Sequence, residues 1–254
     1  MDPGLRDQSA LVTGASRGLG RAIALALGAE GARVAVGYRR ERELAERVAE
    51  ACRRAGAPSA EAIRLDVASE AEILAAFDET ARRLGDPTVL VNNAAVCPRG
   101  PAAATSRDEF QQVLEVNLTG AFLCCRELLH RLEQAARPGR IVNVASTAAF
   151  TGSSSGRQVA YDASKGGLVS LTLSLAREAA PLGVTVNAVA PGYMHTDMMA
   201  EKLAAGPERY LGRIPLGRLA RLEEVAAAVV FLASRQAAYV TGSVVNVSGG
   251  LLMR

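Results

Sequence analysis

The sequence contains no tryptophan, and aromatic residues make up only 4% of its 254 residues. Proteins that bind single-stranded nucleic acid usually stack the bases on aromatic side chains, so this composition disfavours that class. The net charge is only +3, and basic residues alternate with acidic ones, as in 39–43 and 221–224. This mixing is typical of solvated helices rather than of a surface for a phosphate backbone. We therefore expect no nucleic-acid partner.

The four cysteines lack the spacing of a metal site or a disulfide framework. Cys124 and Cys125 are adjacent, so they point in different directions on a helix. We expect buried free thiols, as in a reducing compartment, and no bound metal. No apolar run reaches the roughly 18 residues of a membrane span, and residues 1–7 lack a basic-then-apolar signal. These absences predict a soluble, cytoplasmic protein with no membrane segment.

Lysine is also scarce, because Lys165 and Lys202 are the only two. Lysine has a compact charge whose pKa responds readily to its surroundings. In a helix that opens at 159–165, Tyr161 lies four residues before Lys165 and shares its face. The positive charge favours phenolate, so we predict that the pKa of Tyr161 falls towards neutrality. Such a phenol can exchange a proton with a carbonyl or an alcohol.

A tyrosine and a lysine four residues apart are common on solvated helix faces, so the pair alone carries little weight. Ser146 strengthens the catalytic interpretation because it ends the strand-like run 141–145, and α/β folds place their active sites at strand ends. The sequence therefore singles out Ser146, Tyr161 and Lys165.

Alternating strand-like and helix-like runs occupy the whole chain, and no linker or repeat divides it. We predict a single α/β domain, a doubly wound, Rossmann-like parallel sheet with helices on both faces and right-handed crossovers. The predicted strands cover 9–13, 33–37, 62–65, 88–91, 140–145, 184–190 and 243–247. The predicted helices cover 21–29, 41–54, 70–84, 108–135, 159–180 and 222–234.

Gly14, Gly18 and Gly20 lie between the first strand and the first helix. Glycines let the backbone approach a diphosphate, and a helix N-terminus supplies unpaired N–H groups. The spacing is Gly-x-x-x-Gly-x-Gly, not the usual Gly-x-Gly-x-x-Gly. An ordinary glycine-rich turn is the alternative, but a strand before it and a helix after it favour dinucleotide binding. The predicted cofactor turn also includes Ser16, Arg17 and Leu19.

The end of the second strand distinguishes the two nicotinamide cofactors. An acid about 20 residues past the glycine turn would hold the ribose of NAD, whereas arginine accommodates the 2′-phosphate of NADP. Arg39 and Arg40 stand there with no acid before Glu41, and Arg17 adds a cation. We predict NADP. The alternative is that these arginines only begin the charged helix 41–54.

The next strand ends carry further candidates for the cofactor site. Asp66 and Val67 could meet the adenine, although Asp66 or Ser69 could equally cap the following helix. Asn93 and Ala94 follow the fourth strand, where an asparagine could fix the loop, touch the cofactor, or do both.

Asn117 lies inside the predicted helix 108–135, although asparagine competes for backbone hydrogen bonds. It marks either a helix kink or an exposed carbonyl or amide that holds a water.

Pro191 and Gly192 force a turn after the sixth strand, before Met194 and Thr196. Breakers within 194–218 predict a small mobile lid over the substrate. His195 could be a second acid or base, but a single histidine in a loop is more often solvated.

Together these residues resemble the classical short-chain dehydrogenase/reductase family. The resemblance covers essentially the whole chain, through 13–20, 92–95, Asn117, Ser146, 161–165 and 191–196, in the order and spacing of the family. It implies a catalytic tetrad. Tyr161 would exchange the proton, Ser146 would orient the substrate oxygen, Lys165 would lower the tyrosine pKa and hold the nicotinamide ribose, and Asn117 would position a water. Hydride would move between nicotinamide C4 and the carbonyl carbon.

Within the family, 214–218 and 239–251 are most similar to the 3-oxoacyl-[acyl-carrier-protein] reductases. That similarity implies NADPH-dependent reduction of a small-molecule or carrier-bound acyl substrate, as in fatty acid biosynthesis, and a homotetramer. Arg137 matches one carrier-protein contact, but Leu182 occupies the place of a second. Ala95 and Ser248 also depart from the usual glycine and aspartate. The alternatives are a dehydrogenase of a sugar, polyol or steroid alcohol, and a non-catalytic dinucleotide sensor.

Overall fold

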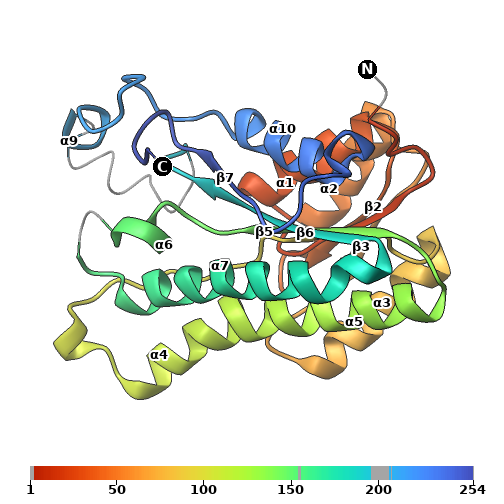
Figure 1. Cartoon of the computed structure of the whole chain (residues 1–254), viewed down its shortest axis with the longest axis horizontal. Helices are drawn as coiled ribbons and strands as arrows, with labels where there is room; N and C mark the ends of the chain where they lie inside the picture. The colour runs from red at the N-terminus through yellow and green to blue at the C-terminus, as the bar shows by residue number, and fades with distance from the viewer. Residues whose placement is uncertain (1–2, 154–155, 196–205, 207, 254) are drawn as a thin grey trace.

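Seven parallel strands form one sheet in the order β3-β2-β1-β4-β5-β6-β7, with helices on both of its faces (Figure 1). The computed structural model describes residues 3–153, 156–195, 206 and 208–253. The predicted doubly wound sheet is confirmed, and each strand overlaps its predicted range. The strands are β1 (Ser9–Val12), β2 (Arg33–Tyr38), β3 (Ala60–Arg64), β4 (Val89–Asn92), β5 (Gly139–Val144), β6 (Val184–Pro191) and β7 (Val244–Val247).

Two apolar cores sandwich the sheet because successive strand residues point to opposite faces. Ala10 and Val12 pack on one side, whereas Leu11 packs on the other. Helices α1 (Gly18–Ala29), α2 (Arg42–Ala55) and α10 (Leu222–Ala233) cover the first side. Helices α3 (Glu70–Leu84), α5 (Gly120–Gln134) and α7 (Val159–Ala179) cover the second.

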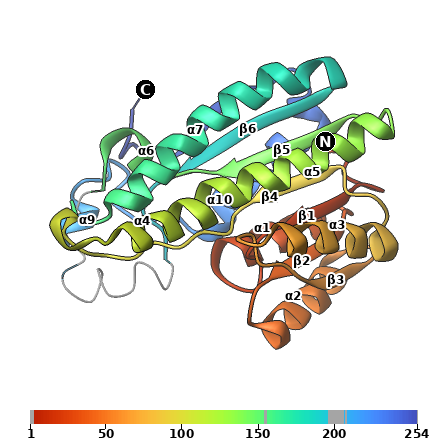
Figure 2. The same cartoon turned by 90° about the horizontal axis from the view of Figure 1, so that it is seen from below.

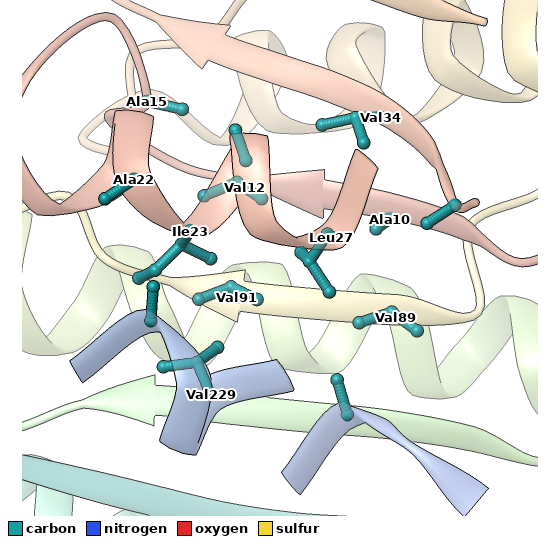
Figure 3. Close-up of a cluster of buried hydrophobic side chains, with 14 of the residues drawn as sticks. Ala10, Val12, Ala15, Ala22, Ile23, Leu27, Val34, Val89, Val91 and Val229 are labelled. Carbon is teal, nitrogen blue, oxygen red and sulfur yellow. The ribbon is translucent and has the colours of Figure 1, made fainter. Parts of the chain in front are cut away.

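Figure 3 shows the first core where α1 and α10 meet the sheet. Ile23 and Leu27 of α1 are fully buried beside Val91 of β4 and Val229 of α10. Each large aliphatic side chain buried in this way stabilises the fold by about 1.5–3 kcal/mol. This packing holds the start of α1, and with it the glycine turn, against the centre of the sheet.

The predicted helix 108–135 is helical over nearly its whole length, but five residues inside it form a π-helical turn that the sequence did not indicate. It is divided into α4 (Arg107–Leu114), a π-helical turn η2 (Glu115–Thr119) and α5. Asn117 lies in the middle of this turn, so the irregularity expected at this residue takes the form of a π-helical turn. The physical reason lies outside the helix, because the Asn117 side chain bonds to the backbone of Val96.

Several short elements complete the described fold. They are η1 (Ala102–Ala104), α6 (Ala148–Thr151), η3 (Ala180–Leu182), α9 (Glu208–Leu211) and η4 (Arg235–Ala237). In the described ranges no helix is both long enough and apolar enough to cross a membrane. Cys52, Cys124 and Cys125 are buried as predicted, but Cys97 is only half-buried because it lies in the loop after β4.

Candidate active site

The sheet brings the predicted site residues to one edge. All strands are parallel, so their carboxyl ends share that edge, on the side that carries α6 and α9 (Figure 1). The strand order reverses between β1 and β4, which is where open α/β sheets bind ligands. At this edge Gly14, Arg39, Asp66, Asn93 and Ser146 each follow a different strand, and Pro191 is the last residue of β6.

The glycine turn has the shape that a diphosphate needs. Gly14 and Gly18 adopt φ values of +62° and +56°, which favour glycine. A Cβ on Gly20 would lie 2.5 Å from both the Asn93 side-chain nitrogen and the Gly14 carbonyl oxygen. A Cβ on Gly18, in contrast, would meet no atom within 4 Å. The turn is therefore tightly packed at Gly20, whereas the space beside Gly18, at the N-terminus of α1, is open. An open helix N-terminus of this kind fits a bound phosphate.

Asn93 fixes this turn, as one of its predicted roles requires. Its side-chain nitrogen donates to the carbonyl oxygens of Thr13 and Gly14, each at 3.0 Å. The Thr13 hydroxyl in turn accepts from the backbone N–H groups of Asn93 and Ala94 at 3.0 and 2.9 Å. The loops after β1 and β4 are thus joined into one rigid surface, and Thr13 is a contributor that the sequence analysis did not single out.

Arg17 and Arg39 are the two basic residues predicted to contact the cofactor. Arg17 is the extended residue before α1. Arg39 is half-buried in the bend after β2, and α2 begins only at Arg42, so Arg39 is not part of the charged helix. Within the described part of the chain Arg39 has no carboxylate partner. It is placed where a cation could meet an anionic ribose substituent.

The segment after β3 shows which of the two candidates caps the following helix. The Ser69 hydroxyl accepts from the Glu72 backbone N–H and caps α3. The Asp66 carboxylate accepts from the Ala68 backbone N–H at 3.1 Å. Val67 is buried at the same strand end. Ser69 is therefore the cap, and the Asp66–Val67 segment is stiffened beside the cofactor edge.

Tyr161 and Lys165 share one face of α7, as their spacing predicts. The Lys165 ammonium nitrogen lies 5.7 Å from the centroid of the Tyr161 ring. It donates to the carbonyl oxygen of Val144 at 2.6 Å. Ser146, two residues beyond β5, is close enough to the phenol for its hydroxyl to favour the ionised form. These contacts bring Ser146, Tyr161 and Lys165 together, as predicted.

The predicted fall in the tyrosine pKa is wrong in this structure. Burial raises the pKa of Tyr161, and the nearby Cys97 raises it further, while Ser146 lowers it and Asp162 raises it. Burial also lowers the pKa of Lys165, to about 8. The helical spacing places the two groups on one face but does not reveal their burial, and burial disfavours the charged form of each group. Tyr161 is therefore a neutral phenol near pH 7.

Asn117 is buried and its side chain is fully engaged, so the prediction of an exposed amide is wrong. Its nitrogen donates to the Val96 carbonyl oxygen at 2.9 Å and to the Ser164 hydroxyl at 3.0 Å. Its oxygen accepts from the Val96 N–H at 2.8 Å. An amide has only two N–H groups, so neither remains for a water. A main-chain carbonyl of the π-helical turn is the remaining candidate for that role.

Two side chains near Tyr161, those of Gln158 and Ser164, were not predicted to belong to the site. The Gln158 side-chain nitrogen donates to the Cys97 sulfur at 2.6 Å, although the two residues are 61 positions apart. No local pattern could have paired them. Ser164 did have a local signal, because it lies three residues after Tyr161 on the same helix and thus on a neighbouring face.

The turn after β6 packs closely against the segment that follows β7. A Cβ on Gly192 would lie 2.9 Å from the Ser248 Cα, so this close approach requires glycine. Met194 forms a bridge with Ala220, and His195 is exposed, as expected for a solvated histidine. Thr196 lies outside the described residues, as do 197–205 and 207 of the predicted lid 194–218.

This combination of a phosphate cradle at the switch point with a grouped serine, tyrosine and lysine defines a dinucleotide-dependent oxidoreductase. A family model described as enoyl-(acyl carrier protein) reductase matches residues 14–252. The chain belongs to the short-chain dehydrogenase/reductase family, whose members use a nicotinamide dinucleotide and act on CH-OH or C=O groups.

Named relatives cover nearly the whole chain. It is 42% identical over 249 residues to the 3-oxoacyl-[acyl-carrier-protein] reductase FabG of Pseudomonas aeruginosa, which covers 98% of this chain and 99% of that protein. It is 41% identical over 252 residues to the FabG of Aquifex aeolicus, with 99% and 100% covered. The crystal structure of a short-chain type dehydrogenase/reductase from Mycobacterium marinum has a TM-score of 0.93 at 32% identity, over 100% and 98% of the two chains.

Proposed function

We propose that this protein reduces the ketone of a 3-oxoacyl thioester to a secondary alcohol with NADPH. The observation that carries the proposal is the identity of 42% and 41%, over nearly the full length, with two 3-oxoacyl-[acyl-carrier-protein] reductases. The grouping of Ser146, Tyr161 and Lys165 at the strand edge supports the same chemistry. Fatty acid biosynthesis in the cytoplasm is the proposed setting.

In this mechanism the protein positions the ketone and supplies a proton. The nicotinamide cofactor supplies the hydride. The Ser146 hydroxyl holds and orients the ketone oxygen, and the Tyr161 phenol donates the proton that this oxygen gains. The raised pKa of Tyr161 suits reduction, because it keeps the phenol protonated near pH 7. The Lys165 ammonium stabilises the tyrosinate left behind, and Asn117 holds the π-helical turn whose backbone would bind a relay water.

NADP is the proposed form of the cofactor, because Arg39 and Arg17 offer cations for a 2′-phosphate and the first acid after β2 comes only at Glu41. The ribose of the nicotinamide would lie against Tyr161 and Lys165. The proposed cofactor-binding residues are Gly14, Ser16, Arg17, Gly18, Leu19, Gly20, Arg39, Asp66, Val67, Asn93, Ala94, Tyr161, Lys165, Pro191, Gly192, Met194 and Thr196.

We further infer that the molecule is a homotetramer. Helices α4, α5 and α7 lie along one side of the molecule (Figure 2), and Phe122 and Leu173 on that side remain 39% and 46% exposed. A groove of about 550 Å³ lies beside Phe110 and Leu114 of α4 and Val159 of α7. A second copy of the chain would cover it.

A second candidate function is reduction or oxidation of a free ketone or alcohol, such as a sugar, polyol or steroid. Leu182 favours this second function. It packs against the core that α3, α5 and α7 cover, and it occupies the position where a second arginine contact to a carrier protein would be expected. The two candidates share the same catalytic group and differ in the substrate that reaches it.

Initial rates separate the candidates. NADPH and NADH oxidation would be followed with an acetoacetyl thioester and with a panel of plain ketones, diketones and ketosugars. Fast NADPH turnover on the thioester is the expected result. Turnover on panel ketones alone would move the protein to the second candidate, and turnover with NADH alone would remove the proposed 2′-phosphate site.

Tyr161→Phe tests the proton donor. The variant keeps the ring but has no proton to give, so turnover is expected to fall by about 10²–10⁴-fold. NADPH affinity, measured by fluorescence titration, is expected to change little. Tyr239→Phe, at a fully exposed tyrosine, is the control. Near-normal turnover of Tyr161→Phe would show that another group donates the proton. A variant that loses turnover but keeps its cellular activity would instead favour a non-catalytic sensor.

A further inference from the structure

Ser164 stands directly before Lys165 on α7 and is 0% exposed. Its hydroxyl donates to the backbone carbonyl oxygen of Tyr161 at 2.7 Å. The same hydroxyl accepts from the Asn117 side-chain nitrogen at 3.0 Å. We propose that Ser164 is a positioning residue, which fixes the Tyr161 turn of α7 relative to the π-helical turn η2. This role rests on the proposed function, since it concerns how the proton donor is placed.

The hydroxyl completes a buried chain of hydrogen bonds between three separate parts of the sequence. Val96, in the loop after β4, exchanges two hydrogen bonds with Asn117. Asn117 donates to Ser164, and Ser164 donates to Tyr161. The loop beside the substrate is thereby tied to the helix turn that carries the phenol. The distance between that loop and the phenol is set by this chain rather than by apolar packing alone.

Serine has the donor and acceptor capacity that this position needs. One hydroxyl gives its single hydrogen to the Tyr161 carbonyl and offers a lone pair to Asn117. In Ser164→Ala, one Asn117 N–H would be left without a partner in a site closed to solvent. The π-helical turn and the first turn of α7 would then be free to move apart. A displacement of about 1 Å between reacting groups can reduce turnover by about 10²-fold.

Thr172 provides a matched control on the same helix. It is also 0% exposed, its hydroxyl donates to the Leu168 carbonyl oxygen at 2.8 Å, and it accepts from the Asn143 side-chain nitrogen at 2.9 Å. The pattern is the same as at Ser164: a bond back to the helix and a bond from an asparagine. Thr172 lies two turns farther along α7, away from Tyr161. A purely structural role predicts equal effects at the two positions.

The experiment compares Ser164→Ala, Ser164→Cys and Thr172→Val. We expect Ser164→Ala to lower kcat by about 10- to 100-fold, with the ketone KM and the NADPH Kd changed by less than about threefold. Ser164→Cys, which keeps a weak donor, is expected to lose less. Thr172→Val is expected to keep kcat within about threefold of the wild type. Equal losses of kcat in Ser164→Ala and Thr172→Val, or a loss confined to KM or Kd, would overturn the proposal.

A second readout does not depend on the substrate. The phenol of Tyr161 can be titrated by ultraviolet difference absorption, with Tyr161→Phe as the reference that identifies it. A loosened turn admits water, so Ser164→Ala is expected to shift this titration to lower pH, while Thr172→Val leaves it in place. The facing groups Cys97, Asp162 and Lys165 are the same in both variants. If the wild type reduces no ketone, the proposed function fails, and identical titrations of the two variants would separately overturn the role of Ser164.

Discussion

At the scale of single residues, burial sets the protonation chemistry of the proposed catalytic pair, Tyr161 and Lys165. Lys165 is enclosed at the end of β5 and bonds to a backbone carbonyl, so its ammonium is held without a carboxylate partner in the described structure. Its pKa is lowered to about 8 for that reason. A buried cation of this kind reduces stability and is retained for its chemistry.

Lys165→Met tests how much stability the buried Lys165 ammonium removes from the folded protein. Between about pH 8 and 10.4 the unfolded chain still holds the lysine proton that the folded chain has released, so the wild type gains stability as the pH rises through this range. The variant lacks this gain. We therefore expect Lys165→Met to be more stable by about 1–3 kcal/mol at pH 7, with the advantage shrinking by pH 9.5. Urea unfolding at the two pH values measures it.

The surface variant Arg137→Met is the control, because it replaces an exposed basic residue with the same methionine and is expected to leave the pH dependence of stability unchanged. A stability difference for Lys165→Met that stays constant with pH would contradict the lowered pKa of Lys165. Turnover is expected to be lost in the same variant, which separates the catalytic role of the ammonium from its effect on folding.

Arg39→Asp tests the cofactor preference at the end of β2. Loss of one charge-assisted contact to a 2′-phosphate removes about 1.5–3 kcal/mol, so the NADPH/NADH ratio of kcat/KM is expected to fall by about 10- to 100-fold. Arg40→Asp is the matched control, because Arg40 is the exposed neighbour. An unchanged ratio in Arg39→Asp would remove this residue from the phosphate site.

At the scale of elements, the π-helical turn η2 separates two helices that the sequence pattern presents as one. Apolar periodicity continues through 108–135, so the local signal is that of one helix. The break arises from partners elsewhere in the chain: Val96 for Asn117, and Val67 for Gly120. A Cβ on Gly120 would overlap the Val67 carbonyl oxygen, and α5 begins at this glycine.

Gly120→Ala is therefore expected to destabilise the protein although alanine is the better helix former. The overlap forces η2 away from the end of β3, at a cost of about 1–3 kcal/mol in the free energy of unfolding. Gly166→Ala, where the nearest atom to the new Cβ is 3.8 Å away, is expected to be neutral or to stabilise by up to about 1 kcal/mol. Urea unfolding of both variants measures this, and similar stabilities would show that η2 yields easily.

At the scale of the whole molecule, α4, α5 and α7 lie along one side (Figure 2), and α5 and α7 carry the exposed apolar side chains of Phe122, Val159 and Leu173. The sheet needs only one side of each helix for its own core, so the exposed Phe122 and Leu173 do not contribute to it. Apolar side chains gathered on one face of a molecule are typical of an interface between protein chains.

Replacing both Phe122 and Leu173 with glutamate is expected to break the proposed tetramer, because carboxylates would be buried between copies. Size-exclusion chromatography with light scattering measures the mass. Leu74→Glu, at a leucine that is 39% exposed on α3, is the control and is expected to leave the mass unchanged. A double variant that keeps the wild-type mass would show that these helices do not form the interface.

The sequence by itself determined the order of strands and helices, the edge at which the site lies and the shared face of Tyr161 and Lys165. These follow from period, turn residues and helical spacing, which act between neighbours in the chain. Only the tertiary structure decided that η2 interrupts a helix, that Gln158 meets Cys97 and that the Tyr161 pKa rises. Each of these depends on which distant groups exclude water from a side chain or share a hydrogen bond with it, and packing alone sets that.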